Sequence, residues 1–266
     1  MKAQALVITG YGINCERETA HAFELAGATS QIIHLNDLIE MPEKLDAAHI
    51  LAIPGGFSFG DDIASGRILA NRLRYKLGAA LNEFVEAKKL AIGICNGFQV
   101  MVKMGLLPHF DQSMQQEVTL THNDSSRFED RWVHLAIDPT SKCIWTCGVE
   151  VMEAPVRHGE GKLIARDNEV LRRLQSQGQI VMRYAHDNGN TASGKYPVNP
   201  NGSVDDIAGI CDPGGRIFGL MPHPEAFLYG YNHPTWTRQP LIQEGAGLKL
   251  FKNAVAFAEE KLVFKS

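Results

Sequence analysis

Short apolar runs alternate with longer amphipathic segments along the first hundred residues of the chain. The runs have the length of buried strands and cover residues 5–9, 31–35, 49–53 and 91–94. Apolar positions at helical spacing predict helices over residues 16–26, 63–87 and 96–104. This alternation of strand and helix is typical of an α/β protein built on a parallel sheet.

The pattern changes beyond Pro108. Short strand-like runs at residues 133–137 and 149–154 predict an antiparallel excursion from the main sheet. The segment 187–206, rich in Asn, Gly and Pro, predicts a long surface loop. A hairpin over residues 207–221 and a closing helix over 244–261 complete the chain, and no linker divides it, so we expect a single domain over residues 1–266.

Cys95 lies where the strand 91–94 meets the helix 96–104. The sequence Gly93-Ile-Cys95-Asn-Gly97 places glycines two positions either side of a nucleophile, which lets a sharp, strained turn expose it. The electropositive helix start favours a thiolate, and the following N–H points to where an oxyanion would form. A lone cysteine after a core strand is more often a packing residue, but the glycine spacing favours an activated nucleophile.

His223 and Glu225 form a second candidate for chemistry. They follow the predicted hairpin in the sequence Pro222-His223-Pro224-Glu225. A proline after His223 keeps that residue extended, and in an extended chain residues two apart face the same way. The carboxylate can then orient the imidazole, while the imidazole takes a proton from a nucleophile. A lone loop histidine is usually a surface residue, and the prolines and the acid favour the catalytic interpretation.

A glycine-rich loop, Pro54-Gly-Gly-Phe-Ser-Phe-Gly-Asp61-Asp62, follows the strand 49–53. Parallel sheets bind ligands at this end of a strand, where glycines let backbone N–H groups turn inward. The alternatives are a plain turn or a phosphate site, although the expected lysine and hydroxyl are lacking. The turn Gly10-Tyr-Gly12-Ile-Asn14-Cys15 falls one residue short of a dinucleotide motif, and we expect Asn14 to cap the following helix. Residues 189–195 imitate a phosphate loop without its hydroxyl residue.

Composition narrows the classes of partner. The 266 residues carry a net charge of −4 and no lysine-rich block, which argues against nucleic acid as a main partner. We expect the basic cluster Arg67, Arg72, Arg74 and Lys76 to be a solvated helix face. No apolar run is long enough for a signal peptide or a membrane span. Five scattered cysteines do not form a disulfide framework, so we expect a cytoplasmic protein. Cys143 and Cys147 lack a second ligand pair, so we expect packing around Trp145 and no bound metal.

Several of these motifs together resemble the class I, triad-type glutamine amidotransferases. The motifs are the glycine-rich loop from Pro54 to Asp61, Gly93-Ile-Cys-Asn-Gly-Phe-Gln99 and Met221-Pro-His-Pro-Glu225. Within that family, Gly12-Ile-Asn-Cys15 and Arg157-His-Gly-Glu-Gly161 are similar to the glutaminase components of phosphoribosylformylglycinamidine synthases, enzymes of purine biosynthesis. The resemblance implies a flavodoxin-like, doubly wound, mainly parallel sheet with helices on both faces and an antiparallel β extension.

The resemblance also implies roles for individual residues. Cys95 would be the nucleophile, His223 the general base and Glu225 its orienter. The reaction would be hydrolysis of L-glutamine to glutamate and ammonia through a thioester. Members of the family often carry an arginine directly after the triad acid, where this chain has Ala226, and any contact of that arginine is in question here.

Five further residues would serve the substrate in such a family. Gln99, one helical turn beyond the nucleophile, would hold glutamine. Gly56 would supply a second oxyanion N–H beside that of Asn96. The stretch from His158 to Glu160 would border the substrate pocket.

The same resemblance implies partners and cofactors. The ammonia would pass to a separate synthetase subunit, with which a small third subunit can associate. ATP and magnesium would bind to that synthetase, and this chain would need no cofactor of its own. Residues 125–132 and 199–206 resemble loops of long, fused synthases, and because no synthase precedes Met1 we expect a separate subunit with enlarged loops.

Alternative functions remain open at this point. The same glutaminase chemistry can serve another acceptor. A cysteine peptidase can use a similar scaffold, although Gln99 favours an amide substrate over a peptide. A catalytically silent glutamine sensor or scaffold is a third possibility, against which the intact set of Cys95, His223 and Glu225 argues.

Overall fold

The computed structural model of the chain describes residues 2–111, 114–238, 240 and 242–263. Its largest element is a nine-stranded sheet, made of β1 (Gln4–Thr9), β2 (Thr29–His34), β3 (Ile50–Ile53), β4 (Leu90–Ile94), β6 (Glu129–Ile137), β7 (Val151–His158), β9 (Ile180–Ala185), β10 (Ile207–Cys211) and β11 (Ile217–Leu220). The strands β5 (Val118–Thr121) and β8 (Lys162–Ala165) pair as a separate antiparallel sheet.

Helices connect and cover these strands. The α-helices are α1 (Glu16–Leu25), α2 (Leu35–Glu40), α3 (Lys44–Ala47), α4 (Arg67–Glu86), α5 (Asn96–Met104), α6 (Asn168–Ser176) and α7 (Leu248–Lys261). The 3₁₀ turns are η1 (Ser58–Asp61), η2 (Ile144–Thr146), η3 (Val204–Asp206), η4 (Pro224–Ala226), η5 (Gly230–Asn232) and η6 (Trp236–Arg238).

The strand order of the main sheet is β2-β1-β3-β4-β11-β10-β9-β6-β7. The first five strands in this order pair in parallel, and from β11 onward each neighbouring pair is antiparallel. The structure therefore confirms an α/β fold whose parallel sheet carries an antiparallel extension.

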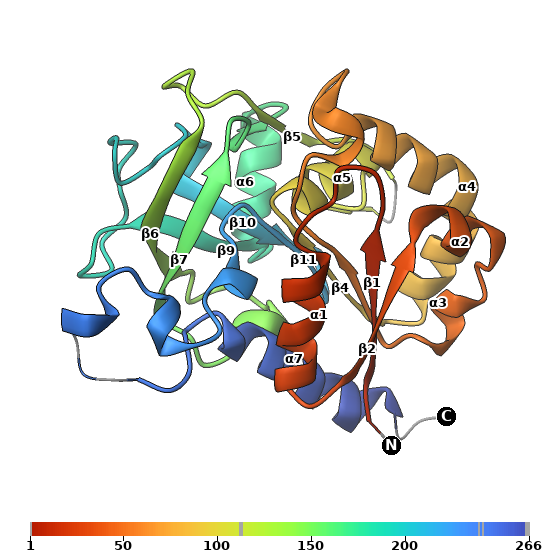
Figure 1. Cartoon of the computed structure of the whole chain (residues 1–266). Helices are drawn as coiled ribbons and strands as arrows, with labels where there is room; N and C mark the ends of the chain where they lie inside the picture. The colour runs from red at the N-terminus through yellow and green to blue at the C-terminus, as the bar shows by residue number, and fades with distance from the viewer. Residues whose placement is uncertain (1, 112–113, 239, 241, 264–266) are drawn as a thin grey trace.

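The strand order reverses between β1 and β3. The chain moves from β1 to β2 in one direction and from β3 to β4 in the other. Because such crossovers are right-handed, α1 and α4 cover opposite faces of the sheet, as Figure 1 shows. Open α/β sheets bind ligands at such a reversal, outside the carboxyl ends of the strands. The loops after β1, β3 and β4 all meet there.

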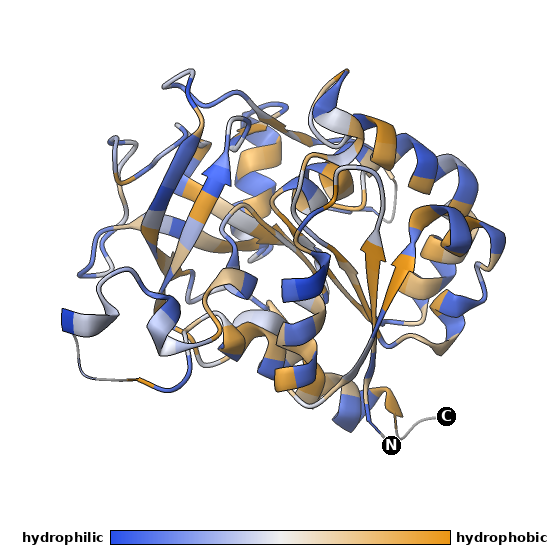
Figure 2. Ribbon diagram, in the orientation of Figure 1, coloured by the Kyte–Doolittle hydropathy of each residue, from blue (hydrophilic) through white to orange (hydrophobic). Residues whose placement is uncertain are grey.

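The core forms because the central strands are apolar along their whole length. All residues of β3, β4 and β11 are buried, and Figure 2 shows these strands in the colours of hydrophobic residues between helices with polar outer faces. Phe23 of α1 and Phe251 of α7 meet edge to face with ring centroids 5.0 Å apart. Full burial of each such ring stabilises the fold by about 2 kcal/mol. The C-terminal helix α7 therefore packs stably against α1, near the start of the chain.

Some of the predicted elements differ from the observed ones. The helix expected over residues 244–261 begins only at Leu248, because the Gly245 and Gly247 N–H groups donate to the carbonyls of Leu228 and Phe227. Asn14 does not cap α1. Its N-cap residue is Cys15, and no side chain caps the helix. The strands β5, β8 and β9 and the helix α6 were not predicted, because they lie beyond the regular alternation of the first hundred residues.

The segment 187–206 is a loop as predicted, but it is not confined to the surface. Asn199 and Asn201 are 2% and 0% exposed. The Asn199 Nδ2 group donates to the Ser203 carbonyl and to Asp206 Oδ1, and the Asn201 Nδ2 group donates to the Gly161 carbonyl. These side-chain amides replace the backbone pairing that a strand would provide, so the loop is able to pack inward.

The close approach of α5 to β3 gives a test of this packing. A Cβ atom on Gly97 would lie 1.8 Å from the Ile53 carbonyl oxygen. We expect Gly97→Ala to lower the free energy of unfolding in urea by about 1–3 kcal/mol, because α5 must move outward. Gly78→Ala is the matched control, since that position in α4 has no neighbour within 4 Å. It should raise stability by up to ~1 kcal/mol. A Gly97→Ala variant as stable as the parent would contradict this account of the packing.

Candidate active site

Cys95 forms the joint between β4 and α5, as the sequence predicts. Its backbone has φ 50° and ψ −105°, a conformation that costs a residue with a side chain about 1–3 kcal/mol. The residue is 5% exposed. Its Sγ donates a long hydrogen bond of 3.6 Å to the Arg157 carbonyl. The turn therefore holds the thiol at the carboxyl edge of the parallel sheet.

His223 and Glu225 lie side by side in the loop after β11. The His223 Nδ1 and Glu225 Oε1 atoms are 2.6 Å apart, and both residues are 3% exposed. Because a carboxylate only accepts, Nδ1–H donates to Glu225, and Nε2 is the ring nitrogen left for proton transfer. Burial lowers the pKa of His223, but the Glu225 carboxylate and the nearby thiols outweigh burial and hold the pKa well above its usual value.

The His223 ring lies within reach of two thiols. Both Cys95 and Cys15 approach it closely enough to raise its pKa, although Nε2 makes no hydrogen bond of good geometry to any group that the structure describes. Burial raises the pKa of Cys15 itself, and the His223 contact lowers it in part. The structure thus brings together the predicted residues Cys95, His223 and Glu225 and adds Cys15. Sequence reasoning missed this fourth neighbour, because its position depends on β1 and β3 being adjacent.

The glycine-rich loop after β3 lies against the turn after β1. Gly56 has φ 146°, and a Cβ atom there would lie 2.6 Å from the Gly12 carbonyl oxygen. An isolated bridge pairs Gly56 with Ile13. Its two hydrogen bonds come from the N–H groups of Asn14 and Phe57, so the bridge leaves the Gly56 N–H unused. This N–H is the predicted second oxyanion donor.

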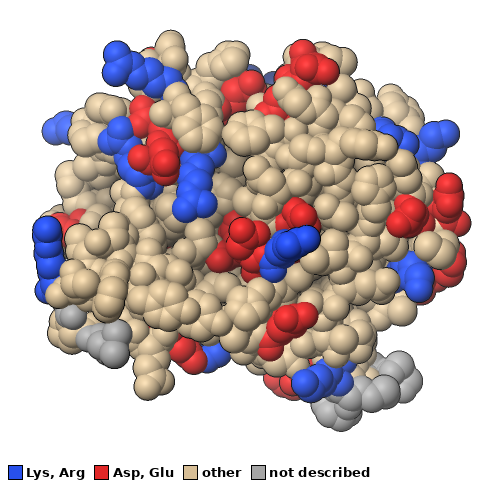
Figure 3. Space-filling view, in the orientation of Figure 1, with Lys and Arg blue, Asp and Glu red and all other residues tan. Residues whose placement is uncertain are grey.

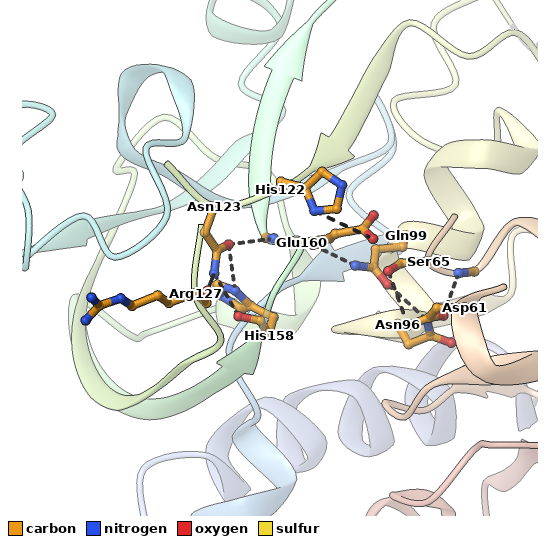
Figure 4. Close-up of polar contacts among 11 residues, drawn as sticks. Asp61, Ser65, Asn96, Gln99, His122, Asn123, Arg127, His158 and Glu160 are labelled. Atoms are coloured by element: carbon orange, nitrogen blue, oxygen red, sulfur yellow. Dashed lines mark hydrogen bonds and ion pairs between the residues drawn. The ribbon is translucent and has the colours of Figure 1, made fainter. Parts of the chain in front are cut away.

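Asn96 joins this loop to α5. Its Oδ1 accepts from the Ser58 N–H at 3.2 Å, and its Nδ2 donates to Asp61 Oδ1 at 3.2 Å and to Gln99 Oε1 at 2.9 Å (Figure 4). The backbone N–H of Asn96 is the first of α5, where helix N–H groups have no partner within the helix. The side chain thereby fixes the loop relative to the predicted oxyanion donors.

The side-chain amide of Gln99 is hydrogen-bonded to other groups of the protein. Its Nε2 donates to the Glu160 carbonyl at 2.6 Å, and the residue is 3% exposed. The structure therefore gives Gln99 a positioning contact, and direct contact with glutamine stays a prediction. The Glu160 carboxylate, 20% exposed, lies 4.0 Å from His122 Nδ1 (Figure 4) and is open to a ligand.

His158 is held by an asparagine that sequence reasoning missed. Asn123 Nδ2 donates to the carbonyls of His158 and Arg127, and its Oδ1 accepts from the Gly161 N–H and from His158 Nδ1 (Figure 4). Burial, together with the charge of His223, lowers the pKa of His158 to about 3. The ring is therefore neutral, and its buried Nε2 is an acceptor without a partner among the described groups. Nothing in the spacing of Asn123 and His158 indicates this contact.

Charged groups elsewhere on the surface are dispersed. Figure 3 shows Lys and Arg interspersed with Asp and Glu over the face in view. Arg67, Arg74 and Lys76 are exposed along α4, as predicted for a solvated helix face, whereas Arg72 is half-buried and donates to Asn36 Oδ1. Within the described part of the chain, no helix is long and apolar enough to cross a membrane.

The chemistry available here is acyl transfer. The site combines a thiol on a strained turn, an oriented imidazole and free N–H groups at a helix start, which is the set that a thioester mechanism needs. Cys15, His223 and Glu225 also bring potential metal ligand atoms within 4.8 Å of one another.

Comparisons with known proteins agree with this geometry. A family described as "CobB/CobQ-like glutamine amidotransferase domain" matches residues 2–258. The "Phosphoribosylformylglycinamidine synthase subunit PurQ" of Dehalococcoides mccartyi is 48% identical over 259 residues, which is 97% of this chain and 99% of that protein. The protein of the same name from Methanococcus maripaludis is 46% identical over 96% of this chain and 97% of its own.

Solved structures give the same result. A chain of the "Structure of PurLQS from Thermotoga maritima" superposes with a TM-score of 0.73 at 30% identity, covering 97% of this chain and 99% of that one. A putative GMP synthase component from Thermoplasma acidophilum, 11% identical with a TM-score of 0.58, shares the fold alone and covers 100% of this chain and 99% of its own. This chain therefore belongs to the glutamine amidotransferase family.

Proposed function

We propose that this chain is the glutaminase subunit of a phosphoribosylformylglycinamidine synthase. It hydrolyses L-glutamine to glutamate and ammonia, which a synthetase partner uses to convert formylglycinamide ribonucleotide to formylglycinamidine ribonucleotide. The observation that carries the glutaminase chemistry is the buried His223–Glu225 pair, 2.6 Å between Nδ1 and Oε1, beside the strained turn of Cys95. Similarity over almost the full length to PurQ relatives supports the acceptor.

The reaction begins when His223 Nε2 takes the proton of the Cys95 thiol. The thiolate attacks the side-chain amide carbon of glutamine, and the N–H groups of Asn96 and Gly56 stabilise the resulting oxyanion. Collapse of this intermediate breaks the C–N bond, and His223 donates its proton to the leaving nitrogen. Ammonia departs and a thioester remains, which water hydrolyses with His223 as general base.

The resting contacts of Cys95 are compatible with this sequence. The thiol donates to the Arg157 carbonyl at 3.6 Å, and a thiol is a weak hydrogen-bond donor. Little free energy is lost when the side chain turns from this carbonyl toward His223. Glu225 keeps the imidazole in the required tautomer throughout, because its carboxylate accepts from Nδ1 and leaves Nε2 as the proton carrier.

Glutamine binds between α5 and the loop after β7. Gln99 holds the Glu160 carbonyl, so it sets the distance between these two walls. The Glu160 carboxylate is the exposed anionic group of this wall and suits the α-ammonium of the substrate. The neutral His158 borders the same pocket.

The acceptor reaction belongs to the partner. ATP and Mg²⁺ bind to the synthetase subunit, and a small third subunit can complete the complex. The whole chain of 266 residues acts as one domain, since its main sheet runs without interruption from β2 to β7. The five cysteines are all free thiols, which suits a reducing cytoplasm.

Removing the nucleophile tests whether this chain serves glutamine hydrolysis alone, with synthesis carried out by the synthetase. In the complex with its synthetase, Cys95→Ser should abolish synthesis that depends on glutamine and should leave synthesis from ammonium salts intact, because Cys95 serves only glutamine hydrolysis. Cys147→Ser, which changes an exposed cysteine, is the matched control and should leave both rates unchanged. Both rates are measured as formation of the amidine product. Glutamine-dependent synthesis that survives in Cys95→Ser would contradict the proposal.

The roles of His223 and Glu225 can be separated by kinetics and pH. Both Glu225→Gln and His223→Ala should lower turnover. The loss in Glu225→Gln should be smaller by roughly one to two orders of magnitude, because an orienting group is partly replaceable and a proton carrier is not. The Glu225 carboxylate raises the pKa of His223, so a neutral amide lets that pKa fall. The acidic limb of the kcat/KM profile, which reports the base that must be unprotonated to take the thiol proton, should therefore move to lower pH in Glu225→Gln. Equal losses in the two variants and an unmoved limb would count against separate roles.

A further inference from the structure

Glu160, the proposed partner of the substrate α-ammonium group, lies in a turn that its own sequence leaves flexible. The turn runs from His158 at the end of β7 to Gly161, directly before β8. Glycines flank Glu160 on both sides, and glycine restrains the backbone less than any other residue. A carboxylate on a mobile turn binds a ligand weakly, because ordering the turn costs free energy at each binding event. The placement of Glu160 therefore depends on contacts from other segments of the chain.

Asn123 makes such contacts along the whole turn. Its backbone N–H donates to the Gly159 carbonyl at 2.9 Å, and its Nδ2 donates to the His158 carbonyl at 2.8 Å (Figure 4). Its Oδ1 accepts from the Gly161 N–H at 3.0 Å. Asn123 is 2% exposed, so removal of its amide would leave buried backbone groups without partners.

The other carbonyls of the turn are held from two further segments. Gln99 Nε2 of α5 donates to the Glu160 carbonyl at 2.6 Å. Asn201 Nδ2 donates to the Gly161 carbonyl at 2.9 Å, and this asparagine belongs to the long loop 187–206. Each carbonyl of the turn thus accepts from a donor outside it, and these donors come from three segments that are distant in the sequence.

Asn201 is fixed by its own surroundings. It is 0% exposed, its Nδ2 also donates to the Tyr184 hydroxyl at 3.0 Å, and its Oδ1 accepts from the Ser203 N–H at 3.0 Å. Its backbone carbonyl accepts from the Asp124 N–H at 3.1 Å. Because Asp124 directly follows Asn123, the two asparagines belong to one connected network. The long loop that carries Asn201 thus supports the turn from beneath.

We propose that Asn123 and Asn201 are positioning residues for glutamine, which hold the turn so that the Glu160 carboxylate meets the α-ammonium group of the substrate. This role rests on the proposed glutaminase function. Both residues act through Glu160 and not on the reacting atoms. A turn that is already ordered lowers the cost of binding, so the network should affect the KM for glutamine more than kcat.

Steady-state kinetics of the complex with its synthetase test this role. Asn123→Ala and Asn201→Ala should each raise the KM for glutamine by about tenfold, because the turn loses buried hydrogen bonds and is free to move. In both variants kcat should fall by a smaller factor than KM rises. Ser203→Ala is a milder change that removes a hydroxyl bonded to Asn201 Oδ1 at 2.8 Å. It should raise KM by a smaller factor, and it tests the network even where Asn201→Ala does not fold.

A matched control separates positioning from general stability. Asn253 of α7 is a half-buried asparagine whose Nδ2 donates to the carbonyls of Trp145 and Cys147 at 2.8 Å each. Asn253→Ala should lower the free energy of unfolding in urea, as the loss of similar bonds does in Asn123→Ala, but should leave the KM for glutamine unchanged.

A double variant tests whether Asn123 acts through Glu160. Glu160→Gln removes the anionic partner of the substrate and should itself raise KM. On that background, Asn123→Ala should raise KM by a smaller factor than it does in the parent chain, since residues that act through one group are not additive. Fully additive effects would overturn the proposed role.

Glutamine affinity distinguishes failure of this role from failure of the proposed function. Calorimetry on the Cys95→Ser complex measures binding without turnover, and adding Asn123→Ala should weaken the affinity by about the same factor as KM rises. A parent complex that binds glutamine but does not hydrolyse it would refute the proposed function and leave the positioning role standing. An unchanged affinity and KM in Asn123→Ala and Asn201→Ala, or an equal rise of KM in Asn253→Ala, would overturn the role while the glutaminase function stands.

Discussion

The strained turn at Cys95 is the constraint on which the site depends. Its backbone stays in a region that costs free energy because β4 is buried on both faces and α5 packs against β3 and β11. Gly97 permits this packing, since its Cα lies against the Ile53 carbonyl. The turn holds the sulfur at the sheet edge and aligns the first N–H groups of α5 beside it, so one packing contact supplies both the nucleophile and an oxyanion donor.

The remaining groups reach the turn through the topology of the sheet. The reversal of strand order puts the loops after β1 and β3 next to each other, and β11 pairs in parallel with β4. His223 follows β11 and therefore enters the same edge as Cys95. The loop from Gly55 to Phe57 is tied to the β1 turn, but the two bonds to its Gly55 carbonyl are long, at 3.3 Å each. This peptide is the part of the site that a docked partner would most readily reorient.

Local sequence patterns predicted more of the site than of the contacts around it. The glycines flanking Cys95 and the two-residue offset between His223 and Glu225 are encoded within a few residues, so spacing alone indicated them. The α/β class followed from the alternating runs in the first hundred residues, and the motifs identified the family. Contacts between distant segments were not predictable in this way. Asn123 reaches His158 across 35 positions, and Cys15 meets His223 only once the strand order is known.

Trapping the covalent intermediate tests the central claim most directly. The chain, assembled with its synthetase, is mixed with glutamine and quenched in acid within a turnover, and its peptides are examined by mass spectrometry. We predict a peptide containing Cys95 that carries the added mass of a glutamyl group and loses it when treated with a strong nucleophile, as a thioester does. The adduct should be absent from Cys95→Ser. A glutamyl group on Cys15 in its place, or glutamate release with no adduct at any cysteine, would contradict the account.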